Sequence, residues 1–389
     1  MKTINRNMMR QMICATFILL VPTSLVYAYP PDNAAVLYYR ACLIYDANNM
    51  MTNKVTDFVK GNIGIDKEIK DYVQKNKFAI KYFVDAGDAP NCDWGLDYSE
   101  GIELQMPRLA PLRILARIVQ AQAKISADSA DYKRALELCL SIHEASPHIA
   151  DGGVLISHLV GISLNALANQ CIMEILPQIS DNPDMLIWLK NQIYDVSERS
   201  PSVKVSINGD LRICSQDINK EKAEYILKMS GDDIPKDKRK IIRNADEAFF
   251  KANKEYFLDY LSTCLTAVDL PYPQSYEQLE KLAKKPANES KKNPDAIMST
   301  LVTPALSTIL CLDLKIRTQF NAVKTALNLY IIRAKSMHLP DELPADLPKD
   351  LFSGKDFEYE KTKDGFVLRC QGKDLSKDKI YEYEFKVKQ

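Results

Sequence analysis

Residues 109–176 read LAPLRILARIVQAQAKISADSADYKRALELCLSIHEASPHIADGGVLISHLVGISLNALANQCIMEIL, and the rest of the chain is organised around them. Its apolar side chains recur every three or four residues, the spacing that places them on one face of an α-helix. Two breaks, at residues 126–128 and 147–153, divide the stretch into three helices. The third is apolar around much of its circumference, so we expect its neighbours to bury it. The stretch predicts a helical core and carries no reaction of its own.

Similar patterns on both sides predict further helices. We expect them over residues 33–46, 50–60, 66–86, 202–229, 238–268, 276–284 and 300–335, with another starting at Pro183. From residue 340 onward three prolines, Pro340, Pro344 and Pro348, exclude a helix. Alternating apolar residues then predict strands over 357–362, 366–371 and 380–387. The sequence therefore predicts a mainly α fold, an antiparallel helical bundle or short irregular helical repeats, with a small C-terminal antiparallel three-stranded β meander.

These patterns divide the chain into five parts. We expect a signal peptide at 1–28, a helical domain at 29–284, a polar connector at 285–295, a long helix at 296–339 and a small β module at 340–389. Lysine and proline enrichment marks the connector. A three-stranded meander needs an apolar cover, and the long helix before it is the nearest element that could supply one.

The first 28 residues have the three features of an export signal. Lys2, Arg6 and Arg10 form a positive start, residues 13–20 an apolar run, and residues 26–28 a cleavage site of the small-residue kind. The apolar run is shorter than the roughly 20 residues of a membrane span. We expect export to the periplasm or the outside of the cell, with an uncleaved anchor as the alternative. No other stretch reads as a membrane span.

Charge and cysteine content narrow the class of protein. Without the three basic residues of the signal, the chain carries 48 Lys and Arg against 51 Asp and Glu, a net charge of −3. This balance gives no electrostatic footprint for nucleic acid. Eight cysteines remain, which permits one or two disulfides in an exported chain. They are Cys42, Cys92, Cys139, Cys171, Cys214, Cys264, Cys311 and Cys370.

An irregular segment, DAGDAPNCDWGLDYSEG at residues 85–101, gathers carboxylates beside two aromatic rings. Asp93, Trp94, Asp97 and Tyr98 are the candidate ligand-binding residues, because carboxylates can hold calcium and an aromatic face can stack on a sugar ring. The alternative is a loop packed on the helices, with Trp94 as its hydrophobic plug. The spacing of the carboxylates does not match an EF-hand.

The tail contains ALNLYIIRAKSMHLPDELPADLP followed by KDLFSGKDFEYEKTKDGFVLRCQGKD. This region is similar to the C-terminal part of type II secretion pseudopilins of the major (G) type, with matches that include Pro348, Gly354 and Tyr359. Leu351 departs from that family's proline. The resemblance implies a helix leading to a strand pair, a calcium ion near Asp374 and Asp378, and association with a secretion apparatus. The alternative for the loop is a solvated lysine-rich turn.

The chain as a whole resembles uncharacterised exported helical bacterial proteins that carry this kind of tail. The residues behind this resemblance are CDWGLDYSEG at 92–101 and the helices of RILARIVQAQAK and ISHLVGISLNALA. ADYKRALEL is similar to one helix of a tetratricopeptide repeat, but no regular 34-residue period follows it. These resemblances imply a shape and attach no activity to it.

The sequence lacks the catalytic motifs that have a fixed spacing. The sequence contains no H-E-x-x-H, no G-x-S-x-G and no phosphate-binding glycine pattern. Carboxylate pairs for glycoside hydrolysis need only spatial proximity, so the sequence leaves them open. We therefore expect an exported non-catalytic scaffold or protein-interaction protein, with protein partners in the cell envelope. A carbohydrate- or peptide-binding or hydrolytic protein that uses the 85–101 loop, and an accessory component of a secretion apparatus, are the alternatives.

Overall fold

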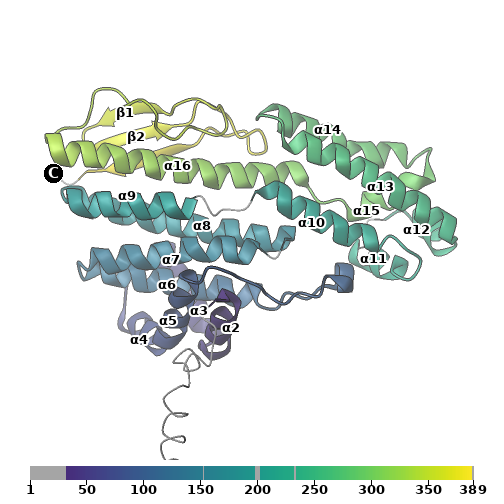
Figure 1. Ribbon diagram of the computed structural model, residues 1–389, viewed down its shortest axis with the longest axis horizontal. Helices are drawn as coiled ribbons and strands as arrows, with labels where there is room; N and C mark the ends of the chain where they lie inside the picture. Colours follow the sequence, from purple (N-terminus) through teal and green to yellow (C-terminus); the bar gives the residue numbers. More distant parts are fainter. Residues whose placement is uncertain (1–31, 152, 198–201, 232–233, 388–389) are drawn as a thin grey trace, which may run out of the picture.

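The computed structural model describes residues 32–151, 153–197, 202–231 and 234–387. In these ranges the protein is mainly helical, with fifteen α-helices and one three-stranded antiparallel sheet. Figure 1 shows the helices in stacked layers, with the sheet at one edge and the N-terminal helices at the opposite edge. The predicted fold class is confirmed.

The central layer consists of α6 (Leu109–Asp128), α7 (Tyr132–Ala150) and α8 (Leu155–Ile175). The carboxylate of Asp131 accepts a hydrogen bond from the backbone N–H of Arg134 at 3.2 Å and so caps the start of α7. Gly161 lets α7 and α8 approach closely, because a Cβ there would lie 2.9 Å from the carbonyl oxygen of Ser146. The predicted burial of α8 is confirmed along most of its length.

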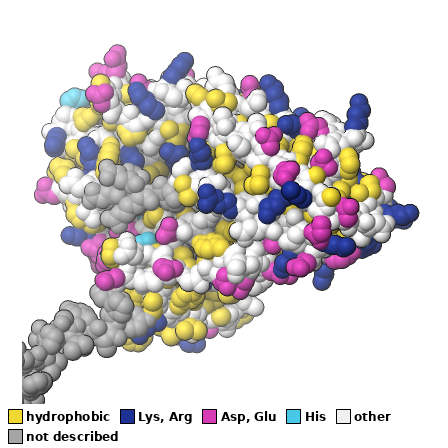
Figure 2. Space-filling view, turned by 45° about the vertical axis from the view of Figure 1, so that its right-hand side comes forward, with side chains coloured by type: hydrophobic (Ala, Val, Ile, Leu, Met, Phe, Trp, Pro, Cys, Tyr) yellow, Lys and Arg dark blue, Asp and Glu magenta, His cyan; other side chains and the backbone are white. Residues whose placement is uncertain are grey.

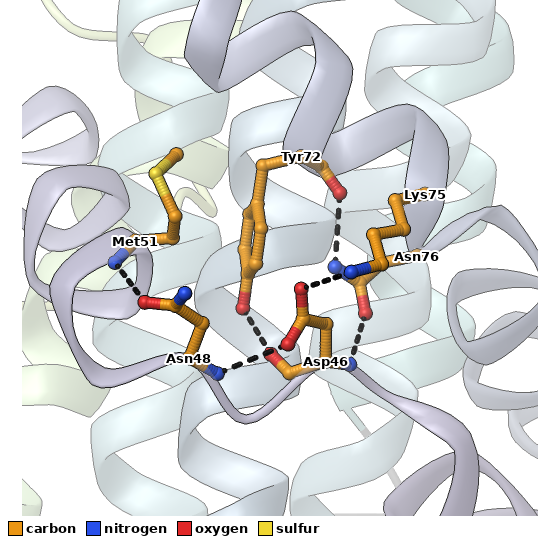
Figure 3. Close-up of polar contacts among 6 residues, drawn as sticks. All are labelled: Asp46, Asn48, Met51, Tyr72, Lys75 and Asn76. Carbon is orange, nitrogen blue, oxygen red and sulfur yellow. Dashed lines mark hydrogen bonds and ion pairs between the residues drawn. The ribbon is translucent and has the colours of Figure 1, made fainter.

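Four short helices cover the N-terminal edge: α2 (Ala34–Ile44), α3 (Asn49–Val59), α4 (Lys67–Lys75) and α5 (Lys77–Gly87). A polar network fixes the turn between α2 and α3 (Figure 3). The Asp46 carboxylate pairs with the Lys75 ammonium at 2.8 Å, and the Asp46 backbone N–H donates to the Asn76 side chain at 2.8 Å. Tyr72 donates its hydroxyl to the Asp46 carbonyl. The network ties the turn to α4.

The central layer, the N-terminal helices and the sheet share one hydrophobic core, the first core, and a second core forms among the helices on the right of Figure 1. They are α10 (Val203–Gln216), α11 (Ala223–Met229), α12 (Lys236–Arg243), α13 (Glu247–Val268), α14 (Gln274–Glu289) and α15 (Ser299–Val302). Phe250, Phe257 and Tyr260 of α13 are buried there. These aromatic rings therefore form part of the second core.

The 31-residue helix α16 (Leu306–Ser336) joins the two cores. Its first turns pack in the second core through Leu306 and Leu310, and its later turns pack in the first core through Val323 and Leu327. On the first-core side it lies against α8 and α9 (Pro183–Ser197), as Figure 1 also shows. α16 therefore carries the packing from one end of the molecule to the other.

The sheet has the strand order β1 (Glu358–Thr362), β2 (Gly365–Arg369) and β3 (Glu382–Lys386), with antiparallel pairing throughout. Phe366 pairs with Phe385 across β2 and β3, and the two rings stack with centroids 5.3 Å apart. The ring of Tyr330 on α16 meets Phe366 edge to face at 5.5 Å, and its hydroxyl donates to the carbonyl of Lys386. The expectation that the long helix covers the meander is confirmed.

Several predicted helix boundaries were wrong. The helix predicted over 66–86 is divided at Asn76, and the one predicted over 202–229 is divided between Gln216 and Ala223. The predicted polar connector starts too early, because α14 continues through Pro286 to Glu289. Similarly, α7 continues through Pro147, three residues before its end. A proline so close to a helix end removes one backbone hydrogen bond and leaves the others in place.

The predicted signal peptide at residues 1–28 lies outside the described residues. Among those described, the stretches Leu155–Ile179 and Pro294–Ser336 are long and apolar enough to cross a membrane by length and composition. The expectation that no such stretch follows the signal was wrong by these two measures. Both stretches also contribute core residues, among them Leu164 and Leu327. The core helices of many globular proteins meet the same two measures.

All eight cysteines between Cys42 and Cys370 are free thiols in the structure. The one or two disulfides that the sequence permits are therefore not formed here. Six of the eight are buried, as expected for cysteines on apolar faces, where the residue acts as a small hydrophobe.

Candidate functional site

The loop of residues 90–98 is held against the start of α2. The side-chain amide of Asn33 donates to the carbonyl of Asp93 at 2.9 Å, and the backbone N–H of Asp93 donates back to the Asn33 side chain at 2.9 Å. The backbone N–H of Ala34 donates to the carbonyl of Asn91 at 2.8 Å. Asn33 also caps α2 through the backbone N–H of Ala35, so one side chain positions both the helix and the loop.

Trp94 is packed into the helices and is only 6% exposed. Its ring stacks on Tyr38 at 5.7 Å and meets Tyr39 edge to face at 5.5 Å. The Arg108 guanidinium lies 4.4 Å from its ring centroid, and its indole N–H donates to the carbonyl of His148 at 2.6 Å. A ring with these neighbours cannot serve as an open platform for a sugar. The structure places Trp94 as the plug that the packed-loop alternative describes.

Beside this plug lies an open pocket of about 710 Å³ between the loop and the end of α7. From the loop it is lined by Pro90, Asn91, Cys92, Asp93, Trp94, Gly95, Leu96 and Tyr98, and from α7 and its C-terminal cap by Pro147, His148 and Asp151. The structure thus brings three of the four candidate ligand-binding residues to one pocket. Sequence reasoning missed the contribution of α7, which no local pattern marks.

Asp97 is the candidate that does not line the pocket. Its carboxylate accepts hydrogen bonds from the backbone N–H and the hydroxyl of Ser99, at 3.0 and 2.6 Å. The hydrogen bond from the Ser99 hydroxyl is the largest contribution to the lowered pKa of Asp97. Asp97 thereby caps the short 3₁₀ helix η2 (Tyr98–Glu103). Its role in the structure is to shape the loop.

The pocket is electrostatically negative at its mouth. Asp93 and Asp151 are both exposed there, and Asp93 accepts one hydrogen bond, from the backbone N–H of Gly95 at 2.9 Å. Partial burial raises the pKa of Asp151, and the neighbouring charge of Asp93 raises it further. Neither carboxylate forms an ion pair with any lysine or arginine that the structure describes. The two carboxylates therefore repel each other without a compensating cation from the described chain.

The tail loop arranges its carboxylates differently. Asp374 is 2% exposed, and one of its oxygens accepts from the backbone N–H and hydroxyl of Ser376 at 2.9 and 2.6 Å. The other accepts from the Tyr381 hydroxyl at 2.7 Å. Asp378 points outward and pairs with the Lys373 ammonium at 2.5 Å. Both carboxylates have protein partners without an ion, and calcium binding at Asp374 and Asp378 stays a prediction.

Other titratable side chains lie in the helical core. His143 is buried against Phe320 and contacts the Asn165 side-chain oxygen through Nδ1 at 3.0 Å, and its burial lowers its pKa to about 4. His158 contacts Asp313 at 3.3 Å. Among the described residues no group of three or more His, Cys, Asp and Glu side chains is arranged to hold a metal ion. Figure 2 shows the charged side chains of both signs interspersed over the face it presents.

Comparison with known proteins adds no identification. No family model matches the chain, and no curated protein or solved structure matches it either. The resemblance of the tail to pseudopilins gains no support from these comparisons and stays a prediction.

Proposed function

We propose that this chain is a non-catalytic binding protein, and that the pocket beside Trp94 holds a peptide segment of a protein partner. A basic side chain of that segment would lie between Asp93 and Asp151. The observation that carries the proposal is the pair of exposed carboxylates at the mouth of a pocket of about 710 Å³, with no cation from the described chain to neutralise them. A lysine or arginine from a ligand would relieve their repulsion.

The lining of the pocket favours a peptide over a sugar. The ring that would stack on a sugar, Trp94, is covered by Tyr38, Tyr39 and Arg108. Leu96 and Pro147 supply apolar surface beside the polar groups of Asn91 and the two carboxylates. A peptide segment offers the same mixture of apolar, amide and charged groups.

The cellular setting is part of the proposal. The positive start, apolar run and cleavage site within residues 1–28 support export, and an exported binding protein would meet its partner in the cell envelope. The near-zero net charge supports a protein partner over nucleic acid.

Thermal unfolding in the presence of a capped peptide tests the proposal. The probe is acetyl-Ala-Ala-Lys amide, whose only charge is the lysine ammonium, and its partner probe is acetyl-Ala-Ala-Gln amide. A ligand present at 100 times its dissociation constant stabilises a protein by about 2.7 kcal/mol. We expect the lysine probe to raise the melting temperature by several degrees and the glutamine probe to raise it less.

Variants locate the site. The double substitution Asp93→Asn and Asp151→Asn should abolish the difference between the two probes, because it removes both carboxylates and keeps their shape. Asp97→Asn is the matched control, since Asp97 belongs to the same loop and caps η2 without lining the pocket. Equal shifts with both probes in the unaltered protein, or loss of the difference in the Asp97→Asn control alone, would refute the proposal.

A further inference from the structure

Arg108 is a buried cation with an unused hydrogen-bonding edge. It is 3% exposed, and its Nε and Nη2 atoms have no hydrogen-bond partner among the residues that the structure describes. Burial lowers the pKa of its guanidinium. Unpaired buried polar groups are rare in folded proteins because each loses its hydration without a replacement. Such a group therefore requires an explanation.

The unused atoms form a single binding edge. In a guanidinium, the N–H bonds of Nε and Nη2 point in the same direction, the geometry that binds both oxygens of a carboxylate. The guanidinium carbon of Arg108 lies 4.4 Å from the centroid of the Trp94 ring, within the range of a cation–π contact. The free edge of Nε and Nη2 matches the two oxygens of a planar anion such as a carboxylate.

Arg108 lies next to the pocket. It packs on Trp94, which lines the pocket. Its charge also lowers the pKa of two more lining residues, Cys92 and Tyr98. Burial raises the pKa of Tyr98, the charge of Asp151 raises it further, and Arg108 opposes both. Burial and the charge of Asp151 likewise raise the pKa of Cys92, and Arg108 opposes them. The pocket thus has carboxylates at its mouth and a guanidinium behind its lining.

We propose that the pocket takes the C-terminal end of a peptide whose last residue is lysine or arginine. The terminal carboxylate would accept both N–H bonds from the free edge of Arg108, and the basic side chain would lie between Asp93 and Asp151. The exposed ring of Tyr98, 43% accessible, is the lining residue that would move to admit the carboxylate. This inference rests on the proposed function and adds the recognition of the ligand's terminal carboxylate by Arg108.

Calorimetric titration of three probes tests this inference. Acetyl-Ala-Ala-Lys with a free carboxylate carries both charges, and its amide carries only the cation. Free L-lysine carries both charges and an additional α-ammonium group but no peptide chain, so it distinguishes an amino acid from a peptide end. We expect the free acid to bind at least about tenfold more tightly than the amide, the range of a charge-assisted bidentate pair. L-lysine should bind more weakly than the acid peptide. Equal binding would show that the pocket recognises a free amino acid and not the end of a peptide.

Two substitutions at Arg108 locate the effect. In Arg108→Gln the acid and the amide should bind equally, and in Arg108→Lys, which keeps the charge but not the fork, the preference should be partly retained. Circular dichroism and the melting temperature establish that each variant folds. If Arg108→Gln does not fold, the ratio of acid to amide for the unaltered protein decides the question.

The outcomes separate the two proposals. Equal binding of acid and amide, with both lost in the Asp93→Asn and Asp151→Asn double variant, overturns the role of Arg108 and leaves the proposed function standing. A preference for the acid that depends on Arg108 but not on the two aspartates supports Arg108 and overturns the proposed recognition of a basic side chain. If no probe binds the unaltered protein, both proposals fail.

Discussion

The 90–98 loop and the 373–379 loop use the same residue types in opposite ways. Each contains two aspartates near an aromatic side chain. In the tail loop Asp374 accepts three hydrogen bonds from Ser376 and Tyr381, and Asp378 is paired with Lys373. In the 90–98 loop Asp93 accepts one hydrogen bond and lines an open pocket together with Asp151.

The difference separates structural carboxylates from candidate binding carboxylates. A carboxylate whose lone pairs are filled by its own loop stabilises that loop, and an ion or ligand would have to displace those donors. A carboxylate that is exposed beside another carboxylate slightly destabilises the free protein, because the two charges repel each other. A cation that binds between them removes this repulsion. Composition alone cannot distinguish the two cases, because it does not show which donors are near.

The largest expected effect is that of Trp94→Ala. Removing a buried indole leaves a cavity among Tyr38, Tyr39 and Arg108, and such substitutions destabilise by about 4 kcal/mol. We therefore expect a large fall in the urea midpoint of unfolding, with or without peptide. A loss of peptide binding with unchanged stability would contradict the plug and make Trp94 a ligand platform after all.

Next in size is Asp374→Ala. The substitution leaves the Tyr381 hydroxyl and the Ser376 donors without their acceptor, so we expect a destabilisation of about 3 kcal/mol. The control is Asp378→Asn, at a side chain 85% exposed. Asparagine tolerates the positive φ of 54° at this position as aspartate does, so this change should alter the unfolding free energy by less than about 0.5 kcal/mol. If calcium stabilises the unaltered protein and this gain disappears in both variants, the tail loop is a metal site and the comparison fails.

As the pH falls, His143 of α7 should lower the free energy of unfolding at a higher pH than Asp374 of the tail loop does. Burial lowers the pKa of His143 to about 4 in the folded protein, against 6.5 for the free side chain. Between pH 6.5 and pH 4 the imidazole is therefore protonated in the unfolded chain but not in the folded protein. Stability is therefore lost as pH falls through this window, by about 2 kcal/mol between pH 7 and pH 5. His143→Gln should remove that dependence in urea titrations. A dependence that persists in the variant would assign it to other groups.

The tail loop should respond at lower pH. Its hydrogen bonds lower the pKa of Asp374 against the opposing effect of burial, which is the larger single influence. A carboxyl group with a lowered folded pKa contributes stability above its unfolded pKa of about 3.9 and loses it as pH falls through the folded value. Asp374→Asn should thus change the pH dependence only below about pH 4.

The smallest expected effect is that of Asp151→Asn. Partial burial and the charge of Asp93 raise the pKa of this carboxyl, so its ionisation costs more free energy in the folded protein than in the unfolded protein. We expect the substitution to stabilise by at most about 0.5 kcal/mol, because the side chain is exposed and screened. The gain should vanish below the unfolded pKa, where the carboxyl is protonated in both states. A clear destabilisation at neutral pH would mean that Asp151 has a structural partner.

The fold was predictable because its signals are local. Apolar spacing places residues 109–176 in helices, Asp131 caps α7, and alternation from residue 357 onward gives the strands of the sheet. Helix breaks were less predictable. Asn76 interrupts a continuous apolar pattern because its side chain bonds to the backbone of Tyr72 and Asp46, a tertiary contact that spacing does not encode.

The site was predictable only in part. The 85–101 loop is recognisable by its irregularity, and Asp93, Trp94 and Tyr98 do line one pocket. His148 and Asp151 join it from α7, some 50 residues away in sequence, because the helices bring that end to the loop. Arg108 sits at the start of a helix in an ordinary position, and only the structure shows that it is buried under Trp94.

A contact between the carboxylates of the 90–98 pocket and a cation of a peptide would couple substitutions on its two sides. A double-mutant cycle tests it most directly, pairing lysine→glutamine in acetyl-Ala-Ala-Lys amide with Asp93→Asn and Asp151→Asn in the protein. We predict a coupling free energy of about 1 kcal/mol, because both changes remove the same charge contact. A coupling of zero would show that the lysine and the two aspartates do not meet, and the account of this pocket would be wrong.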